Sequence, residues 1–526
     1  MSMFGKILFQ AFLVLLTAGF WIASMPPFNF GELGYVLFVP LLLWVCTKPT
    51  WRAVFWVAGL ASILAWVGIL IWLRHVTIIG TVLLAGCLSL YFILWLSYVR
   101  WTLPRLLHQS FPLRVLGFLG IAGTWVVCEW LRSILLYGMP MGPLALSQWE
   151  KPVMLQIAAW TGAYGVSFFL IFFNCCMAQT FYYLAVSDKK QSVFLRWFKA
   201  DFYLAIAALI SLIFLYLNCL PKSWSENKDR FSFALVQPNL SPLLEWDEAK
   251  NVSRVAQLKQ EVLRAQLLEF DILMLPEAVT PNAIKGDPET LLFFESLVES
   301  QDQPILTGNL AYYRESNRWY NGIFLIEPET GLNPIYYAKK RLVPFGEYTP
   351  EPFSSIIKSF GGTQGSFYPG TTDGIIPIHL KGKEYAFGAL ICYEDIFPAL
   401  ARETVRAGAD VIYVATNNAW YGEEGGAYFH AAHSVLRAVE NRRPVIRCGN
   451  AGWSGWIDAY GSIRSVLTDE SNSIYFKGSG NFTLTLDNQW QSYTSIYTRY
   501  GDWFVGASAI FAVFACLIRK KPNSLL

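Results

Sequence analysis

Several apolar runs in the second half of the chain end in polar residues that could take part in catalysis. The runs end at Glu277, Lys339, Cys392 and Asn417. Because ligands of open α/β sheets bind at the carboxyl ends of strands, these side chains could meet in one site. A carboxylate can take the proton of a thiol, and an ammonium can stabilise the charge that develops during attack on a carbonyl. Glu277, Lys339 and Cys392 therefore suggest a base, a charge stabiliser and a nucleophile.

Each of these residues also has an ordinary structural interpretation. A cysteine after an apolar strand is more often a packed core residue, and a lysine there is more often a solvated strand end. Glu277 alone could be a turn carboxylate. Lys340 and Arg341 compete with Lys339 for the cationic role. Residue types alone therefore leave the catalytic and structural interpretations open.

The composition places part of the chain in a membrane. Of 526 residues 54% are hydrophobic, and the mean hydropathy is +0.36, whereas soluble proteins are about 45–50% apolar. The net charge of +3 comes without a basic stripe or zinc-type cysteine spacing, so nucleic acid is not expected as a partner. Seven of the nine cysteines fall in apolar stretches, and the contexts of Cys392 and Cys448 do not predict a disulfide framework.

Eight apolar runs approach the length of about 17–25 residues that crosses a bilayer as a helix. They cover approximately residues 7–24, 31–47, 53–73, 77–99, 113–135, 162–186, 202–220 and 503–518. This pattern predicts a membrane domain over 1–220, an outer domain over 221–500, and an eighth helix with a short tail over 501–526.

The loops between these runs differ sharply in positive charge, which predicts their orientation. Loops on one side hold Arg74, Arg132 and Lys151. The other side carries thirteen basic residues: Lys6, Lys48, Arg52, Arg100, Arg105, Arg114, Lys189, Lys190, Arg196, Lys199, Arg519, Lys520 and Lys521. We therefore expect both termini in the cytoplasm and residues 221–500 on the outer face of the membrane.

Residues 221–500 are patterned as an α/β domain, with strand-length apolar runs between turn residues. Helices are expected over about 247–269 and 427–441. Strands are expected over Phe231–Val236, Ile272–Leu275, Pro304–Thr307, Gly322–Ile326, Tyr385–Ile391 and Val411–Ala415.

Three segments of this domain resemble the signature segments of the apolipoprotein N-acyltransferase family, the membrane branch of the nitrilase superfamily. They are Leu275-Pro276-Glu277, the run from Lys339 to Glu347, and Cys392-Tyr393-Glu394. Pro26-Pro27-Phe28, Glu129-Trp130-Leu131-Arg132 and the run from Tyr497 to Asp502 extend the resemblance over nearly the whole chain.

The resemblance implies a nitrilase-like α-β-β-α sandwich on a membrane domain of eight transmembrane helices. It also implies a bacterial inner-membrane enzyme that takes an acyl chain from a phospholipid as a thioester. The chain would pass to the α-amino group of a diacylglyceryl-cysteine at a lipoprotein N-terminus. Cys392 would be the nucleophile, Glu277 the base and Lys339 the stabiliser, with Glu347 and Glu394 as supporting carboxylates. Spacing within the family motif favours Lys339 over Lys340, and no metal or other cofactor is implied.

Other residues give weaker indications. Trp246 and Asn321 resemble positions near the family's active-site mouth, and Trp420 and Tyr421 could either enter the membrane interface or pack between domains. The family commonly has Asn-Asp-Ala-Trp where this chain has Asn417-Asn418-Ala419-Trp420, so an acidic role at position 418 is in doubt.

Two further pairs of polar residues could be either functional or structural. His430 and His433, three apart on an expected helix, are interpreted as packing residues rather than metal ligands. Glu129 and Arg132 are either functional intramembrane charges or partners of one another.

Three other functions compete with acyl transfer. A membrane-tethered nitrilase-type amidase would use the same triad with water as acceptor, although eight spans exceed what a tether needs. A transporter with an outer domain is disfavoured because the spans lack paired broken helices and an inverted repeat. A lipid-binding scaffold with an inactive triad stays open.

Overall fold

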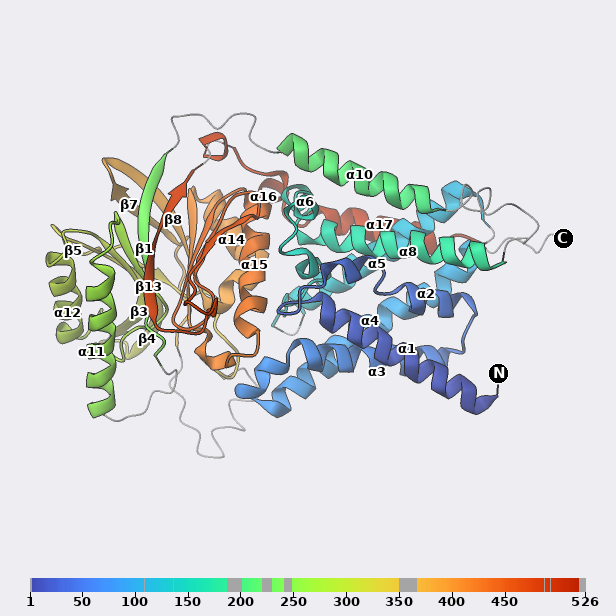
Figure 1. The fold of residues 1–526 in the computed structure, drawn as a ribbon, viewed down its shortest axis with the longest axis horizontal. Helices are drawn as coiled ribbons and strands as arrows, with labels where there is room; N and C mark the ends of the chain where they lie inside the picture. Colours follow the sequence, from blue (N-terminus) through green and yellow to red (C-terminus); the bar gives the residue numbers. More distant parts are fainter. Residues whose placement is uncertain are drawn as a thin grey trace. The chain divides into compact units, whose positions relative to one another are not determined.

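The computed structural model describes residues 2–107, 109–135, 137–186, 201–219, 229–240, 248–349, 367–486, 488–491 and 493–519. It divides into two compact units. The first comprises Met1–Pro221, Glu424–Ala432 and Tyr500–Leu526, and the second Lys222–Glu423 and His433–Arg499. The first unit is helical and the second contains the β-sheets (Figure 1). The domain boundaries drawn from the sequence stay a prediction.

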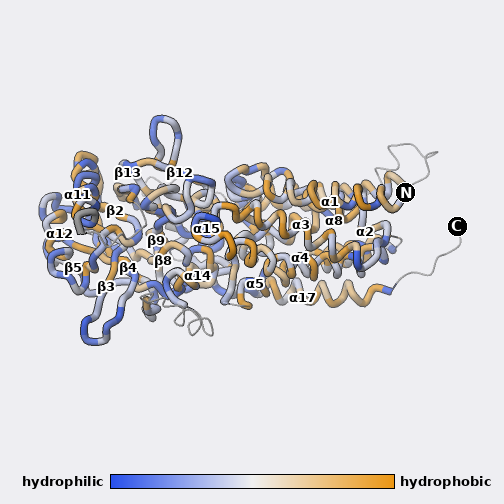
Figure 2. The backbone as a smooth tube through the Cα atoms, turned by 90° about the horizontal axis from the view of Figure 1, so that it is seen from below, coloured by the Kyte–Doolittle hydropathy of each residue, from blue (hydrophilic) through white to orange (hydrophobic). Residues whose placement is uncertain are grey.

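Six helices of the first unit are long and apolar enough to cross a membrane, and Figure 2 shows α1, α3 and α4 as predominantly hydrophobic. They are α1 (Met3–Ser24), α3 (Trp51–Ile69), α4 (Ile78–Leu106), α5 (Phe111–Ile134), α8 (Ala163–Val186) and α10 (Phe202–Cys219). Shorter elements are η1 (Gly31–Tyr35), α2 (Val39–Cys46), η2 (Ile71–His75), η3 (Leu144–Gln148), α6 (Pro152–Leu155), α7 (Ala158–Thr161), α16 (Ile496–Tyr500) and α17 (Trp503–Cys516).

The expected span over 31–47 is interrupted. A 3-10 turn, η1, precedes the eight-residue helix α2, which has Pro40 in its first turn. Pro40 has no N–H to donate to the carbonyl of Val36, so an unbroken helix is disfavoured at this point. The buried Asn174 of α8 forms hydrogen bonds with backbone groups at this interruption: it accepts from Phe38 N at 2.8 Å and donates to Gly34 O at 2.8 Å. The structure therefore confirms six long apolar helices, and the count of eight spans stays a prediction.

Helix α17 is 14 residues long, about 21 Å at 1.5 Å per residue. It packs against α5 through small residues. A Cβ added to Gly120 would lie 2.2 Å from Ala515 Cβ, and one added to Gly123 would lie 2.3 Å from Ser508 O. Close approach through small residues is typical of helix pairs in membranes.

The second unit contains two sheets. The first has the strand order β13-β1-β2-β3-β4-β5, with β6 paired to β4, and the second has the order β12-β11-β10-β9-β8-β7. The first sheet consists of β1 (Arg230–Gln237), β2 (Ile272–Leu275), β3 (Ile305–Tyr313), β4 (Arg318–Glu327), β5 (Gly331–Leu332), β6 (Tyr337–Ala338) and β13 (Gly478–Thr485). The second consists of β7 (Ile375–Leu380), β8 (Lys383–Ile391), β9 (Val411–Thr416), β10 (Val445–Gly449), β11 (Gly455–Ile457) and β12 (Ile463–Val466).

The two sheets face one another across a hydrophobic core that includes Phe233 and Met274 from one sheet and Phe387 and Tyr413 from the other. A second core lies between the first sheet and its helices, α11 (Glu248–Ala265) and α12 (Pro288–Glu299). Helices α14 (Pro398–Arg406) and α15 (Gly426–Asn441) are associated with the second sheet: α14 packs on β8 and β9, and Ser434 of α15 bonds Arg447 of β10. This arrangement confirms the predicted α-β-β-α sandwich (Figure 1).

Two central strands match the sequence prediction closely, because strands buried on both faces appear as continuous apolar runs. β2 has the predicted bounds, and β9 extends the prediction by one residue to Thr416. β3 and β4 are longer than predicted: β3 runs to Tyr313 rather than Thr307, and β4 begins at Arg318 rather than Gly322. Helix α11 ends at Ala265 rather than 269. Helices α12 and α14 were not predicted; they are only 12 and 9 residues long, so they offer few turns in which a helical repeat can be recognised.

Candidate active site

Cys392 follows directly on β8 and begins a 3-10 turn, η4 (Cys392–Ile396). Its backbone has φ +50°, in the left-handed region. Non-glycine residues pay about 1–2 kcal/mol to adopt this conformation and keep it only where their surroundings enforce it. The residue is 7% exposed, so the thiol lies at the buried end of a strand.

Glu277 follows β2, and the neighbouring β3 holds its backbone. Gly308 of β3 donates its N–H to Pro276 O at 3.1 Å. A Cβ on Gly308 would lie 2.7 Å from Glu277 Cα, so only glycine permits this approach. The buried Asn321 of β4 fixes the carboxylate by donating to Oε1 at 2.8 Å.

Lys339 follows β6 and is 1% exposed. Its backbone N–H donates to Asn321 O at 2.8 Å. Its Nζ lies 2.7 Å from Glu347 Oε1 and 3.3 Å from Glu277 Oε1. Asn321 Nδ2 also reaches Glu347 Oε1 at 3.3 Å. The structure thus brings Glu277, Lys339, Glu347 and Asn321 into one buried, hydrogen-bonded group.

Lys340 and Arg341 point elsewhere. Lys340 Nζ lies 3.5 Å from Glu403, and its side chain is 22% exposed. The Arg341 guanidinium lies over the Phe397 ring at 5.5 Å. The geometry therefore favours Lys339 as the cation of this group.

The charges of this group act on one another. Burial disfavours the Lys339 ammonium, but Glu347 and Glu277 outweigh it and hold its pKa well above the ordinary value. Burial and then the Glu277 charge raise the pKa of the Cys392 thiol to about 12, while Lys339, the Thr416 side chain and the Asn417 backbone oppose this rise. At neutral pH the thiol therefore keeps its proton.

The raised thiol pKa predicts a pH-dependent stability. An unfolded cysteine titrates near about 8.5, so above that pH the unfolded chain loses a proton that folded Cys392, with its pKa of about 12, retains. The contribution of the Cys392 thiol to the free energy of unfolding is fully present below about pH 8.5. It is lost toward pH 12, by at most about 1.4 kcal/mol per pH unit. Thermal unfolding from pH 7 to 10 should show wild type losing more stability than Cys392→Ala; parallel curves would contradict the raised pKa.

Glu394 joins the cysteine turn to the lysine segment. Its fully buried carboxylate accepts hydrogen bonds from the backbone N–H groups of Ile391, Lys340 and Arg341 at 2.7–3.0 Å and from the Tyr337 hydroxyl at 2.8 Å. Burial raises the pKa of Glu394 to about 6, against the opposing effect of these donors and Lys339. It is therefore ionised at neutral pH and orients both segments.

The residues that the sequence indicated more weakly differ in their positions relative to this site. Tyr421 lies near the site: burial, followed by the charges of Cys392 and Glu277, raises the pKa of its hydroxyl well above the ordinary value. Trp420 is 45% exposed. Asn321 bonds Glu277, whereas Trp246 lies outside the described residues.

The sequence placed Asn417 at a strand end that could share a site with Cys392, and its backbone does act on the Cys392 thiol. Thr416, whose side chain also acts on the thiol, was not predicted for the site. A signal for Thr416 was present, because this residue ends the apolar strand β9, which pairs with β8. Asn417 is fixed by Asn450, whose Nδ2 donates to Asn417 Oδ1 at 3.0 Å. Asn418, where the family commonly has aspartate, is buried and accepts from Thr416 Oγ1 at 3.2 Å.

The remaining cysteine and histidine candidates are buried. Cys448 lies between the sheets, 3.4 Å from Met274 O, and neither Cys448 nor Cys392 is in a disulfide. His430 and His433 lie on α15. Among the described residues, no three His, Cys, Asp or Glu side chains are grouped to hold a metal ion.

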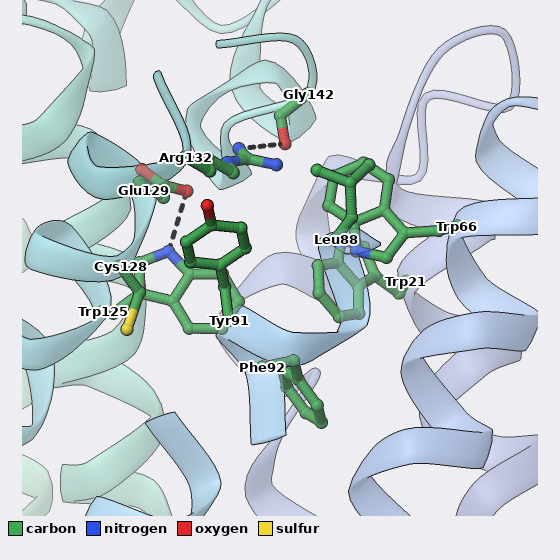
Figure 3. Close-up of a pocket in the computed structure, with 10 residues that line it drawn as sticks. All are labelled: Trp21, Trp66, Leu88, Tyr91, Phe92, Trp125, Cys128, Glu129, Arg132 and Gly142. Carbon is green, nitrogen blue, oxygen red and sulfur yellow. Dashed lines mark hydrogen bonds between the residues drawn. The ribbon is translucent and has the colours of Figure 1, made fainter. Parts of the chain in front are cut away.

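Glu129 and Arg132 of α5 do not pair with each other. Both lie in the described part of the chain. Glu129 Oε1 accepts from Trp125 Nε1 and Leu144 N, each at 2.8 Å, and Arg132 Nη2 donates to Gly142 O at 2.9 Å (Figure 3). Both therefore brace the segment that follows α5.

These two charges border a largely aromatic hollow that also includes Trp21, Trp66, Leu88, Tyr91, Phe92 and Cys128 (Figure 3). Its volume of about 30 Å³ is room for about two water molecules, too little for an acyl chain.

Two family models match the chain. The apolipoprotein N-acyltransferase N-terminal domain matches residues 17–176, and the carbon-nitrogen hydrolase domain matches residues 232–512. Similar proteins include the apolipoprotein N-acyltransferase of Geobacter metallireducens, 29% identical over 95% of this chain and 94% of the relative. That of Brucella melitensis is 27% identical over 87% of each chain, and that of Chlorobaculum tepidum is 26% identical over 98% of each.

The second match contains all of the residues grouped around Cys392, and the first covers most of the long apolar helices. The chain thus belongs to the carbon-nitrogen hydrolase family, in the branch that carries the apolipoprotein N-acyltransferase N-terminal domain.

Proposed function

We propose that the protein is an N-acyltransferase of lipoprotein maturation. It transfers an acyl chain from a membrane phospholipid to the α-amino group of the diacylglyceryl-cysteine of an apolipoprotein. The observation that carries this proposal is the buried Glu277–Lys339 pair acting on Cys392, in a chain that also has six long apolar helices. A water-soluble substrate would not need those helices, whereas lipid substrates reside in the bilayer.

In the first half-reaction, Glu277 removes the proton of Cys392 as the sulfur attacks the ester carbonyl of the phospholipid. The carbonyl π electrons move to oxygen, and the Lys339 ammonium stabilises the oxyanion. The C–O bond then breaks, and the departing glycerol oxygen takes the proton from Glu277. The products are a Cys392 thioester and a lysophospholipid.

In the second half-reaction, the neutral α-amine of the lipoprotein attacks the thioester carbonyl. Glu277 accepts a proton from the nitrogen, the C–S bond breaks, and the sulfur regains that proton. Glu347 and Asn321 keep Lys339 and Glu277 in place throughout. The chain's own side chains supply every proton transfer.

The mouth of the site is proposed to include Trp246, Asn321, Trp420 and Tyr421. The exposed Trp420 ring favours contact with lipid or with the membrane interface. Tyr421, beside Cys392, is suited to contact the acyl or acceptor group.

We also propose the orientation in a bacterial inner membrane. Eight spans are obtained if the shorter helices Gly31–Cys46 and Trp503–Cys516 also cross, and the excess of basic residues in alternate loops favours cytoplasmic termini. Residues 221–500 would then form a periplasmic catalytic domain. In spheroplasts, a protease should cleave this domain and leave a C-terminal tag intact; the reverse pattern would contradict the orientation.

The activity is tested by incubating purified protein with phosphatidylethanolamine of defined acyl composition in detergent micelles. Mass spectrometry should detect an acyl adduct on Cys392 and release of the lysolipid. A diacylated lipopeptide should then discharge the adduct and become triacylated. Discharge by water at the same rate without lipopeptide would favour a membrane-tethered amidase, and absence of the adduct would reject the thioester route.

A further inference from the structure

Two adjacent carboxylates, Glu394 and Asp395, lie fully buried in the turn that begins with Cys392. Glu394 bonds the lysine segment. Asp395 has different partners: its Oδ2 accepts from Ser434 Oγ at 2.6 Å and forms an ion pair with Arg447 Nη1. Two separate sets of contacts therefore hold the turn, one through Glu394 and the other through Asp395.

Arg447 is a fully buried residue in the middle of β10. Its neighbours Ile446 and Cys448 belong to the core between the sheets, so alternation along the strand directs Arg447 toward the helix side. Arg447 Nη1 also lies 2.9 Å from Ser434 Oγ of α15. Asp395, Arg447 and Ser434 thus form a closed triangle that joins the cysteine turn to β10 and α15.

A second guanidinium holds the backbone of the same turn. Arg437 Nη1 of α15 donates to Asp395 O at 3.3 Å and to Ile396 O at 3.2 Å. Carbonyl groups at the end of a helical turn otherwise lack partners. Arg437 is itself neutralised by Glu440, with Nε and Oε2 2.8 Å apart. Side chain and backbone of the turn are therefore both fixed from α15 and β10.

Fold stability alone does not account well for such a buried pair. Taking two charges out of water costs as much as or more than their attraction returns, and apolar residues of similar volume often serve stability equally well. The pair does fix the orientation of the turn, because it ties the turn to β10 and α15. The turn needs this because Cys392 has φ +50°.

We propose that Asp395 and Arg447 are positioning residues for acyl transfer, which hold the Cys392 turn through contacts separate from those of Glu394. Without them, the turn relaxes and the sulfur moves away from Glu277 and Lys339. A displacement near 1 Å costs on the order of 100-fold in rate. The identity of the reaction rests on the proposed function, whereas the positioning of the sulfur does not.

The test compares wild type with Asp395→Leu/Arg447→Met, which removes both charges together and leaves neither buried alone. The first readout is single-turnover acylation of Cys392 by phosphatidylethanolamine in micelles. The expected result is a rate lowered about 100-fold at an unfolding midpoint close to wild type. An acylation rate within about threefold of wild type would overturn the proposal, because the pair would then serve stability alone.

The control breaks an ion pair in the same unit that does not contact the turn. Asp458→Asn/Arg464→Met removes a pair with Arg464 Nη2 2.6 Å from Asp458 Oδ2. It should leave the acylation rate within about threefold of wild type. An equal loss of rate in this control would show that any lost ion pair has this effect and would overturn the proposal.

A second readout needs no lipid: the pH profile of Cys392 alkylation by iodoacetamide, followed by mass spectrometry. In Asp395→Leu/Arg447→Met the profile should shift by a pH unit or more toward an ordinary thiol near pH 8.5. If wild type forms no acyl adduct, the proposed function fails, and this profile alone decides the positioning; superimposable profiles would overturn it.

If the double variant does not fold, Ser434→Ala decides the question with both charges kept. It removes the hydroxyl that joins Asp395 to Arg447. Acylation should fall and the alkylation profile should shift in the same direction, by smaller amounts. No change in either readout would overturn the proposal.

Discussion

Cys392→Ala is expected to form no acyl adduct and to lower N-acylation by at least about 10⁴-fold. In a nucleophile-base unit, loss of the nucleophile alone removes nearly all of the catalysis that the unit supplies. The side chain is small and buried at a strand end, so the fold should persist. The measurement is intact-protein mass spectrometry after incubation with phospholipid, together with the yield of triacylated lipopeptide.

The matched control is Cys448→Ala. Cys448 is a second buried cysteine of the same unit, but it lies within β10, and its Sγ contacts Val236 O and Met274 O between the sheets. We expect the adduct and the activity to persist in this variant. An adduct that survives in Cys392→Ala and disappears in Cys448→Ala would identify Cys448 as the nucleophile and contradict the role proposed for Cys392.

Lys339→Met is expected to lower the rate of acyl-enzyme formation by at least about 10³-fold. Loss of one oxyanion-stabilising donor costs about 10²–10³, and two buried carboxylates would also lose their shared cation. Glu277 and Glu347 both lie within 3.3 Å of Nζ and would repel one another. Removing one partner of a buried ion pair costs about 3–5 kcal/mol, so the unfolding midpoint should fall too.

Lys340→Met is the control for this change. It is adjacent in sequence and removes the same charge, but its Nζ lies near Glu403, and its side chain is partly exposed. Its activity should stay within a few-fold of wild type, as is usual for exposed ion pairs. Single-turnover rates and thermal midpoints of the two variants show which lysine the reaction depends on. A greater loss of rate in Lys340→Met than in Lys339→Met would assign the cationic role to Lys340.

The elements could be predicted where burial leaves a simple pattern. β2 and β9 are buried on both faces and are almost continuously apolar. The six long helices are also apolar over most of their length. Prediction failed where local chemistry interrupts the pattern. Pro40 and the Asn174 contacts interrupt the second expected span, and α12 and α14 are too short, at 12 and 9 residues, to show a clear helical repeat.

The sequence by itself determined the residue types and their positions at strand ends, namely Glu277, Lys339 and Cys392. These positions can be recognised because strand order and strand length appear in the chain. With the family resemblance, they were sufficient to name the chemistry.

Only the tertiary structure decided which side chains meet. It placed Lys339 rather than Lys340 between two carboxylates, and it separated Glu129 from Arg132. It also joined Asp395 to Arg447, 52 residues apart in sequence. Such partners depend on where side chains point after strands pair and helices pack, and sequence spacing does not contain that information.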